Sequence, residues 1–541
     1  MLNEISHYAR LTLGIGQYLR TPPHVDPETV IRRQLHYRAS LFLDTARRVI
    51  FARPGNPYFE MFRLADCSYA DLEQAVAKDG MEKTLAVLHR HGIYLTHDEF
   101  KEKGPIVRSG RCIPARRSSF LNPLVSGKIV SRSSGSRGKG TVSPLSTQLR
   151  LYREAQTRLR LKELGLERRT HVEVKPILPS MTGLGSCLWA KRLGHKVDRW
   201  FTVGGSLQSS GHYRWATRFM VLASNVMGGG VPAPRYLPPN DFSPVAEWIA
   251  RRRIQGDPCF VSAFTSPAVR IAAAAVEKGF DIRGTVFLVA GEALTEAKRC
   301  AIEKSGAKVF NSYPISEMGL MGHACSKMTA GSRVHLFKDS LAVINYRKKA
   351  PLTDAEVDSF LCTTLLPFSS YVLINAEADD CGSIEPATCD CLFSRVGFTE
   401  QLRDIGSYGK LTGQGMTLVG TDIVKILEEA MPAQLGGAPG DYQLVEHEGA
   451  AQTQVTLRVS PRVGILSTDK AKECFLKEIR KYFGGALAAR MWSHADGFQA
   501  VIAEPFSTIT GKIVPLHLLR EPHSASAGSA GSGAIEGRHE T

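Results

Sequence analysis

The feature that most constrains the fold is a regular alternation of apolar strands with helices between about residues 170 and 313. Predicted strands cover 171–178, 258–264, 284–291 and 308–313, and predicted helices cover 244–256, 267–279 and 295–306. The strands are rich in β-branched and aromatic residues, and each of these helices ends at a glycine. This alternation predicts an α/β fold with a mostly parallel sheet, right-handed crossovers and helices on its faces.

Sheets of this kind bind ligands at the carboxyl ends of their strands. Gly291 and Glu292 lie where one predicted strand ends, and Tyr313 ends the next strand along the chain. We therefore expect these residues to lie at a ligand-binding edge.

The pattern changes on both sides of this segment. Residues 1 to about 125 are predicted to be mainly helical, with a long amphipathic helix that has Asp26 as its cap and Pro27 at its first position. After the glycine-rich stretch 406–420, a smaller α+β unit is predicted from helices at 422–430 and 472–483 and strands at 454–459 and 499–504. We expect a large N-terminal domain over 1–404, a small mobile C-terminal domain over 405–521 joined by a hinge, and a flexible, tag-like tail over 522–541.

Composition excludes several classes of protein. Eleven cysteines are an odd number, which argues against a disulfide framework and for a reducing compartment. No apolar run approaches 18 residues and the N-terminus lacks a signal-peptide pattern, so we expect a cytoplasmic protein. The net charge of +16 is distributed in short clusters such as Arg251–Arg253, without a known nucleic-acid-binding motif. It predicts a basic surface and no specific nucleic acid, and it leaves peripheral contact with a membrane open.

The stretch "SSGSRGKGT" at 133–141 combines glycines, hydroxyls and cations, which together form nests for phosphate oxygens. It is not a Walker loop, because Ser133 stands where the first glycine is needed and Gly140 follows Lys139 in place of Ser or Thr. By itself the stretch is also compatible with a polar surface loop.

Four further motifs follow in order, namely "GEAL" at 291–294, "YPISE" at 313–317, "EADDCG" at 377–382 and "TGK" at 510–512. Together with the loop at 133–141 they resemble the adenylate-forming superfamily of acyl-coenzyme A ligases and adenylation domains, and the nearest resemblance is to phenylacetate-coenzyme A ligases. The segment "WFTVGGSLQSSGHY" at 200–213 is similar to another stretch of those ligases. The resemblance covers roughly residues 55 to 520.

The resemblance implies a two-step reaction. A carboxylate attacks the α-phosphate of ATP and pyrophosphate leaves, and a thiol, with coenzyme A as the first expectation, then takes the acyl group from the acyl-adenylate. Such a site works by positioning and charge neutralisation, so it needs hydroxyls, backbone amides, cations and a metal-binding carboxylate.

Residue roles are carried over from the resemblance motif by motif. The phosphates are assigned to Ser133, Ser134, Gly135, Ser136, Arg137, Gly138 and Lys139, with Arg137 and Gly140 as departures from the family. The adenine and α-phosphate are assigned to Gly291, Glu292, Ala293, Tyr313, Pro314 and Ser316, and Mg²⁺ to Glu317. The ribose is assigned to Asp380, with Asp379 as the alternative, and to Arg403.

Three more assignments concern the hinge, the catalytic lysine and the acid. Lys410 belongs to the expected hinge, and Lys512 resembles the C-terminal lysine that neutralises charge during adenylation. The acid pocket is assigned to Gly204, Gly205, His212 and Tyr213. The catalytic set is therefore Lys512, Glu317 and Arg137.

A cysteine cluster suggests a metal. In the related ligases a similar set holds a structural ion, and the matching residues here are Cys325, His335, Cys389 and Cys391, a Cys₃His set suited to Zn²⁺. Buried free cysteines are the alternative, and Cys381 is a substitute for any member of the set.

The partners expected are thus a small carboxylic acid, ATP with Mg²⁺, and coenzyme A. An acyl carrier protein or a protein cysteine is the alternative acceptor, and a basic protein that binds nucleic acid or an anionic membrane is the alternative of another class. The acid, aryl or fatty, is left open by the sequence.

Overall fold

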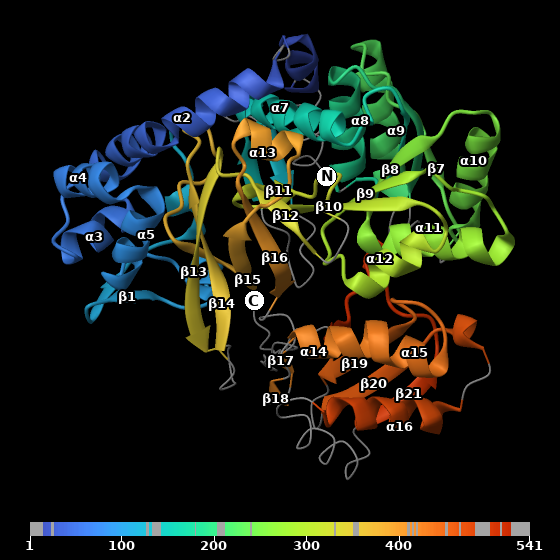
Figure 1. Cartoon of the computed structure of the whole chain (residues 1–541). Helices are drawn as coiled ribbons and strands as arrows, with labels where there is room; N and C mark the ends of the chain where they lie inside the picture. The colour runs from blue at the N-terminus through green and yellow to red at the C-terminus, as the bar shows by residue number, and fades with distance from the viewer. Residues whose placement is uncertain are drawn as a thin grey trace, which may run out of the picture.

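The computed structural model is organised around a 12-stranded sheet with a smaller sheet domain beneath it (Figure 1). The structure describes residues 14–22, 26–125, 129–132, 142–178, 180–202, 211–238, 241–328, 332–349, 356–407, 412–413, 416–417, 420–448, 453–464, 467–481, 498–508 and 511–520. The strand order of the large sheet is β13-β14-β15-β16-β12-β11-β10-β9-β8-β5-β6-β7.

One half of the large sheet is parallel, as expected. Its strands are β5 (Thr170–Val174), β6 (Val197–Thr202), β7 (Pro234–Tyr236), β8 (Cys259–Phe264), β9 (Val286–Ala290) and β10 (Lys308–Ile315). The other half is antiparallel and was not anticipated. Its strands are β11 (Gly319–His323), β12 (Val334–Leu336), β13 (Leu341–Lys349), β14 (Glu356–Thr364), β15 (Ala376–Pro386) and β16 (Glu400–Ser407).

Helices cover both faces of the parallel half because its strands are apolar on both sides. Every residue of β8 is buried. Val261 packs with one helical layer, and its neighbour Phe260 packs with the opposite layer. The first layer is formed by α10 (Ser243–Ile254) and α11 (Thr265–Lys278), with α12 (Glu296–Glu303) next to β10. The opposite layer contains α7 (Thr147–Glu163) and α8 (Thr182–Arg192), with α9 (Gly211–Val226) beyond them.

Helices follow one another from residue 14 to about residue 100, and short strands and turns replace them in the rest of the region that was expected to be mainly helical up to about residue 125. A helix over 14–20 precedes α2 (Pro27–Ala46), η1 (Arg47–Phe51), α3 (Pro57–Leu64), α4 (Tyr69–Asp79), α5 (Met81–Arg90) and α6 (His97–Phe100). The Asp26 side chain caps α2 by accepting a hydrogen bond of 3.1 Å from the Glu28 amide. Short pieces follow as β1 (Ile106–Arg108), β2 (Arg111–Ile113), η2 (Arg117–Phe120), β3 (Ile129–Arg132) and β4 (Val142–Leu145).

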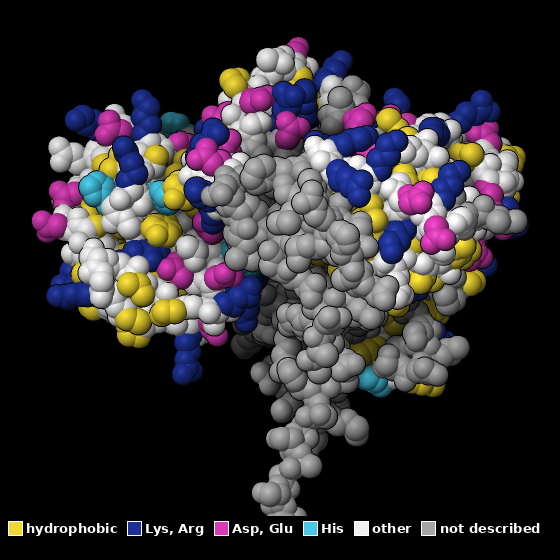
Figure 2. Space-filling model, turned by 90° about the horizontal axis from the view of Figure 1, so that it is seen from below, with side chains coloured by type: hydrophobic (Ala, Val, Ile, Leu, Met, Phe, Trp, Pro, Cys, Tyr) yellow, Lys and Arg dark blue, Asp and Glu magenta, His cyan; other side chains and the backbone are white. Residues whose placement is uncertain are grey.

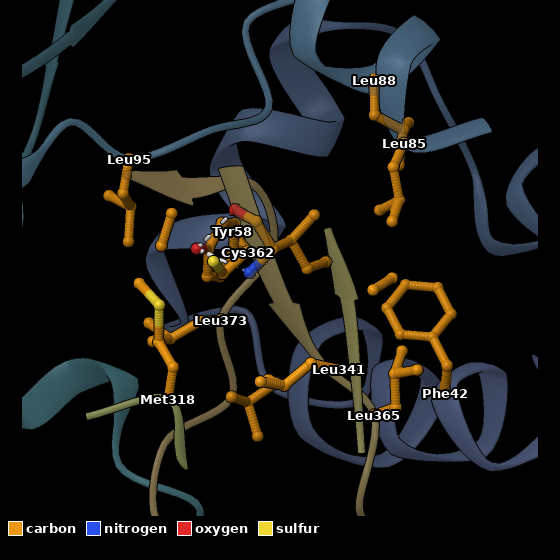
Figure 3. Close-up of a cluster of buried hydrophobic side chains, with 14 of the residues drawn as sticks. Phe42, Tyr58, Leu85, Leu88, Leu95, Met318, Leu341, Cys362, Leu365 and Leu373 are labelled. Carbon is orange, nitrogen blue, oxygen red and sulfur yellow. Dashed lines mark hydrogen bonds between the residues drawn. The ribbon is translucent and has the colours of Figure 1, made fainter. Parts of the chain in front are cut away.

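These helices pack on the antiparallel half of the sheet. Figure 3 shows Phe42 from α2, Tyr58 from α3 and Leu85 from α5 converging on Leu341 and neighbouring strand residues. Met318, the residue after Glu317, lies in the same cluster. The core therefore anchors the turn that carries the predicted metal-binding carboxylate.

The C-terminal unit has its own sheet, with the order β21-β20-β19-β22, and its own core. Its elements are β17 (Thr412–Gly413), β18 (Met416–Thr417), α14 (Gly420–Lys425), η3 (Ile426–Ala430), α15 (Met431–Leu435), β19 (Tyr442–Glu448), β20 (Thr453–Val459), η4 (Pro461–Val463), α16 (Thr468–Ile479), β21 (Phe498–Ile502) and β22 (Leu516–Arg520). The short helix α13 (Leu392–Val396) comes before this unit and belongs to the region of the large sheet. Among the helices in the described ranges, none is both long and apolar enough to span a membrane.

Candidate functional site

Three parallel strands bring the central motifs to one edge. In the register of the sheet, Phe264 at the end of β8 pairs with Ala290 at the end of β9, and Ala290 pairs with Ser312 of β10. Gly291 and Tyr313 are the next residues of their strands, so they emerge side by side at the carboxyl edge. This is the position at which parallel sheets bind ligands.

Tyr313 is held by one of the two candidate ribose residues. Its hydroxyl donates a hydrogen bond of 2.6 Å to Oδ2 of Asp380 in β15. Burial and the adjacent carboxylate raise the pKa of Tyr313, so the phenol stays protonated and donates. Asp379 has a left-handed backbone with φ of 62°. The geometry thus places Asp380, rather than Asp379, against the tyrosine of the "YPISE" motif.

Glu317 lies in the turn between β10 and β11 and has an ion-pair partner that the sequence did not suggest. Its Oε1 is 2.5 Å from Nζ of Lys101, which directly follows α6. The exposed fraction of the Glu317 side chain is 11%. Pro314 and Ser316, in the same segment, are exposed.

Lys512 reaches the carboxyl edge from the C-terminal unit. Its Nζ donates a hydrogen bond of 3.0 Å to the carbonyl oxygen of Gly291 and lies 4.6 Å from the centre of the Phe264 ring. The backbone of Lys512 is fixed in turn by Thr508, whose amide donates to the Lys512 carbonyl at 2.8 Å. A cation from the end of the chain is thereby placed beside the ends of β8 and β9.

Ser266, at the start of α11, connects this lysine segment to Glu292. Its hydroxyl donates to Oε2 of Glu292 at 2.6 Å and accepts from the amide of Ile513 at 3.3 Å. Burial raises the pKa of Glu292, although Lys298 and Lys512 oppose that shift. Ser266 was missed by sequence reasoning, and its place just after a strand end was the one signal that pointed to it.

A buried ion pair links α12 to the C-terminal unit. Nζ of Lys298 is 2.7 Å from Oε1 of Glu428 in η3, and each side chain is 5% exposed. Thr295 donates a hydrogen bond of 2.6 Å to the other oxygen of Glu428. Burial acts to lower the pKa of Lys298, but the attraction of Glu428 and Glu292 outweighs it and raises that pKa.

The remaining predicted site residues lie in other parts of the described structure or outside it. Arg403 in β16 pairs with Glu385 at 3.6 Å and with Asp404 at 3.2 Å. Tyr213 packs at the edge of an apolar cluster, whereas His212 is exposed on α9. Several predicted site residues lie outside the part of the chain that the structure describes, namely Ser133, Ser134, Gly135, Ser136, Arg137, Gly138, Lys139, Gly204, Gly205 and Lys410.

The cysteine cluster forms a compact group of possible metal ligands. The ligand atoms of Cys325, His335, Cys389 and Cys391 all lie within 4.8 Å of one another. The sulfur of Cys389 is 3.7 Å from that of Cys325 and 3.8 Å from that of Cys391, and Nε2 of His335 is 3.2 Å and 3.3 Å from the sulfurs of Cys389 and Cys391. At a tetrahedral zinc with bonds of about 2.3 Å to sulfur and about 2.0 Å to nitrogen, neighbouring ligands are roughly 3.5–3.8 Å apart.

Hydrogen bonds around the cluster affect the protonation of its candidate ligands. Nδ1 of His335 lies 2.9 Å from the carbonyl oxygen of Phe398, which can only accept, so the proton is on Nδ1 and Nε2 carries the lone pair. Hydrogen bonding from Cys325 lowers the pKa of the Cys391 thiol, although burial opposes that shift. Cys381 lies instead in β15, outside this group, where burial raises the pKa of its thiol to about 11.

Comparisons with known proteins support the fold. No protein-family model and no curated protein matches the sequence. Two similar solved structures are of a 2-hydroxyisobutyryl-CoA ligase in the postadenylation state, one in complex with R3-HIB-AMP and one with 2-HIB-AMP. Each alignment has 14% sequence identity, covers 90% of this chain and 89% of the ligase, and has a TM-score of 0.51. The expected fold class is confirmed, and at this identity the likeness is one of fold.

Proposed function

We propose that this protein is an ATP-dependent, AMP-forming carboxylic acid ligase that activates an aryl or acyl carboxylate as acyl-AMP and transfers it to coenzyme A. The observation that carries the proposal is the position of Lys512 Nζ, 3.0 Å from the Gly291 carbonyl at the carboxyl edge of the parallel strands. The "YPISE" and "EADDCG" motifs meet at the same edge through the bond between Tyr313 and Asp380.

In the proposed first step, a carboxylate oxygen attacks the α-phosphorus of ATP, the bond to the β-phosphate oxygen breaks, and pyrophosphate leaves with the electron pair. The proposal assigns the Lys512 ammonium to offset the negative charge that accumulates on the α-phosphate oxygens. In the second step, the thiolate of coenzyme A attacks the acyl carbon and AMP leaves. Both steps depend on positioning and charge, so no protein nucleophile is required.

The residues present fit a magnesium ion. Glu317 supplies a carboxylate in a turn anchored by Met318, and hard cations such as Mg²⁺ take carboxylate oxygens together with substrate phosphates. Bound there, Mg²⁺ supplies charge neutralisation for the phosphates. In the structure Lys101 pairs with this carboxylate at 2.5 Å, so an ion bound by Glu317 would compete with Lys101 for it.

We also propose that Cys325, His335, Cys389 and Cys391 hold a structural Zn²⁺. Support comes from the spacing of their ligand atoms and from the lone pair of His335 Nε2 directed at the cluster. A set of four protein ligands is typical of structural zinc sites. The ion joins the β11–β12 hairpin to the start of α13, so its role is to stabilise the antiparallel half of the sheet.

The alternative of a nucleic-acid-binding protein has less support. On the face seen in Figure 2, basic side chains are interspersed with acidic ones rather than gathered in one basic surface. An alternative acceptor, such as a carrier protein, uses the same first step and differs only in the thiol. The "DSL" sequence at 339–341 is no site for a phosphopantetheine arm, because Ser340 is buried at 8% exposure.

The proposal is tested by acid-dependent AMP release over a panel of aryl and fatty acids, with and without coenzyme A. We expect AMP release with at least one acid and formation of its thioester. Lys512→Ala is expected to lower the adenylation rate at least about 100-fold. The matched control is Lys477→Ala, which removes an exposed lysine of the same unit, on α16, and should leave the rate unchanged.

Two results would contradict the proposal, in whole or in part. One is the absence of AMP release with every acid while the protein binds DNA with a steep salt dependence. The other is full adenylation by the Lys512 variant, which would refute the charge-neutralising role that the proposal gives to Lys512 and leave the AMP-forming activity standing.

A further inference from the structure

Helix α9 has a second apolar face opposite the one that it buries. Thr217, Met220, Val221 and Ser224 are buried against the protein. The opposite side carries Trp215, Phe219, Leu222 and Val226, with exposed fractions of 71%, 58%, 65% and 81%.

The spacing of the exposed residues makes them a continuous stripe. They follow one another at intervals of four, three and four residues, which places them along one line of a helix with 3.6 residues per turn. Single exposed apolar residues are ordinary on protein surfaces, but a line of four large side chains on one helix marks a surface that binds something apolar. Nothing in the ligase function proposed above uses this stripe.

The charges around the stripe indicate what it binds. Between Gly211 and Val226 there are two arginines, Arg214 and Arg218, and no aspartate or glutamate. Arg218 is exposed, and its guanidinium carbon is 5.5 Å from the centre of the Trp215 ring. The helix therefore combines a tryptophan, a phenylalanine and a leucine on one line with cations beside them, as interfacial membrane helices do.

We propose that α9 docks on an anionic lipid surface, with Trp215, Phe219, Leu222 and Val226 inserted at the level of the headgroups. Arg218 then lies at the depth of the lipid phosphates, where its charge is neutralised. A second copy of this chain fits the surface less well. A two-fold contact sets α9 against α9 and brings arginines together without any acid on either helix.

The test is co-sedimentation of the full chain with vesicles. Wild-type protein should bind vesicles of phosphatidylcholine containing phosphatidylglycerol, and bind less to phosphatidylcholine alone or at high salt. Replacing the four stripe residues by serine should weaken partitioning at least about tenfold. Ile254→Ser is the matched control, because Ile254 is 81% exposed on α10 outside the stripe, and it should bind as the wild type does.

Charge is tested separately. Arg218→Glu should weaken binding to the anionic vesicles about fivefold or more, whereas Lys78→Glu, on α4, should not. Because every substituted side chain is exposed, unchanged thermal unfolding is expected and shows that binding, not folding, was altered.

Two experimental results would contradict the proposal that α9 docks on an anionic lipid surface. The proposal is wrong if wild-type protein does not bind the anionic vesicles, or if the serine variant binds them equally well. A wild-type dimer that the serine variant converts to a monomer, without any vesicle binding, would assign the stripe to a second copy instead. Neither result bears on AMP release, so the ligase proposal is tested independently.

Discussion

Lys101 and Glu317 form an ion pair of 2.5 Å between residues 216 positions apart in the chain. The carboxylate is the one that we propose for Mg²⁺, and the lysine side chain is 27% exposed. A cation from the protein and a cation from solution therefore compete for the same oxygen atoms.

Lys101→Met is expected to tighten the apparent binding of Mg²⁺ several-fold, because the ion no longer displaces an ammonium group. The measurement is adenylation rate as a function of Mg²⁺ concentration at saturating ATP. Lys103→Met is the control, since Lys103 is 61% exposed and pairs with Asp98. An unchanged magnesium dependence, with a raised KM for ATP, would mean that Lys101 contacts a phosphate instead.

Gly291→Ala should disturb the position of Lys512. An added Cβ lies 2.9 Å from Lys512 Nζ and 3.0 Å from Phe264 Cδ1, and the φ of +83° costs a side chain about 1–2 kcal/mol. We expect a drop in adenylation rate beyond any loss of stability. Gly284→Ala is the control, because Gly284 has a φ of +80° with nothing within 4 Å of the added atom. Equal rates in the two variants would argue against the crowding.

Ser266→Ala removes the bridge between Glu292 and the segment of Lys512. Loss of its two hydrogen bonds, one of them to a carboxyl group, should cost about 1–3 kcal/mol in the free energy of unfolding. Since the hydroxyl normally opposes the rise in the pKa of Glu292, that pKa should rise further. Urea unfolding measures the first effect, and the pH profile of kcat, which should shift upward, measures the second. A variant with wild-type stability and an unshifted profile would contradict the bridge.

The zinc proposal predicts about one Zn²⁺ per chain in protein purified without chelators, measured by elemental analysis. Cys389→Ser should lower zinc content and thermal stability together, whereas Cys300→Ser, at an exposed cysteine outside the cluster, should change neither. Substoichiometric zinc, with unfolding unaffected by chelators, would leave the cluster as free thiols.

Because the carboxyl group of Asp339 is buried, we expect its contribution to the stability of the protein to decrease as pH rises. Burial raises the pKa of its carboxyl group, although hydrogen bonds from Tyr152, Gln156 and Ser340 oppose the shift. The raised pKa means that its contribution is present below the ordinary range of an aspartate and is lost as pH rises through the folded-state value. Asp339→Asn should therefore gain stability relative to wild type in urea unfolding as pH rises above the ordinary range of an aspartate.

Asp281→Asn is the opposite control for that experiment. Hydrogen bonding from Arg283 lowers the pKa of the partly exposed Asp281 carboxyl group, so its contribution is lost as pH falls. If the free energy of unfolding of Asp339→Asn changes with pH as steeply as that of wild type, the Asp339 carboxyl group does not cause the pH dependence of stability.

Sequence periodicity predicted the parallel half of the fold well. Strand β8 and helix α11 lie within a few residues of their expected bounds, since alternation of apolar runs and capped helices is a local property. The antiparallel half was missed because β13 and β14 pair over nine residues, several of which are exposed and polar, and such strands lack a strong apolar signal.

The candidate site residues also divide into those that local motifs identified and those whose surroundings only the tertiary structure shows. Tyr313, Glu317, Asp380 and Lys512 each belong to a local motif, and the resemblance of these motifs, in their order, to a known family was sufficient to suggest a nucleotide site. His212, which was assigned to the acid pocket, is exposed on α9, and Gly204 and Gly205 of the same assignment lie outside the described residues, so this assignment stays a prediction.

The sequence by itself determined the α/β class, since the alternation of apolar strands and helices is a property of spacing along the chain. The motifs and the four candidate metal ligands came from a family resemblance that the sequence carries. Only the tertiary structure decided which distant groups meet: Lys512 with Gly291 across 221 residues, and Lys101 with Glu317. The reason is physical. Such contacts depend on how strands align at the edge of the sheet and on where the C-terminal unit packs, and no local pattern encodes either.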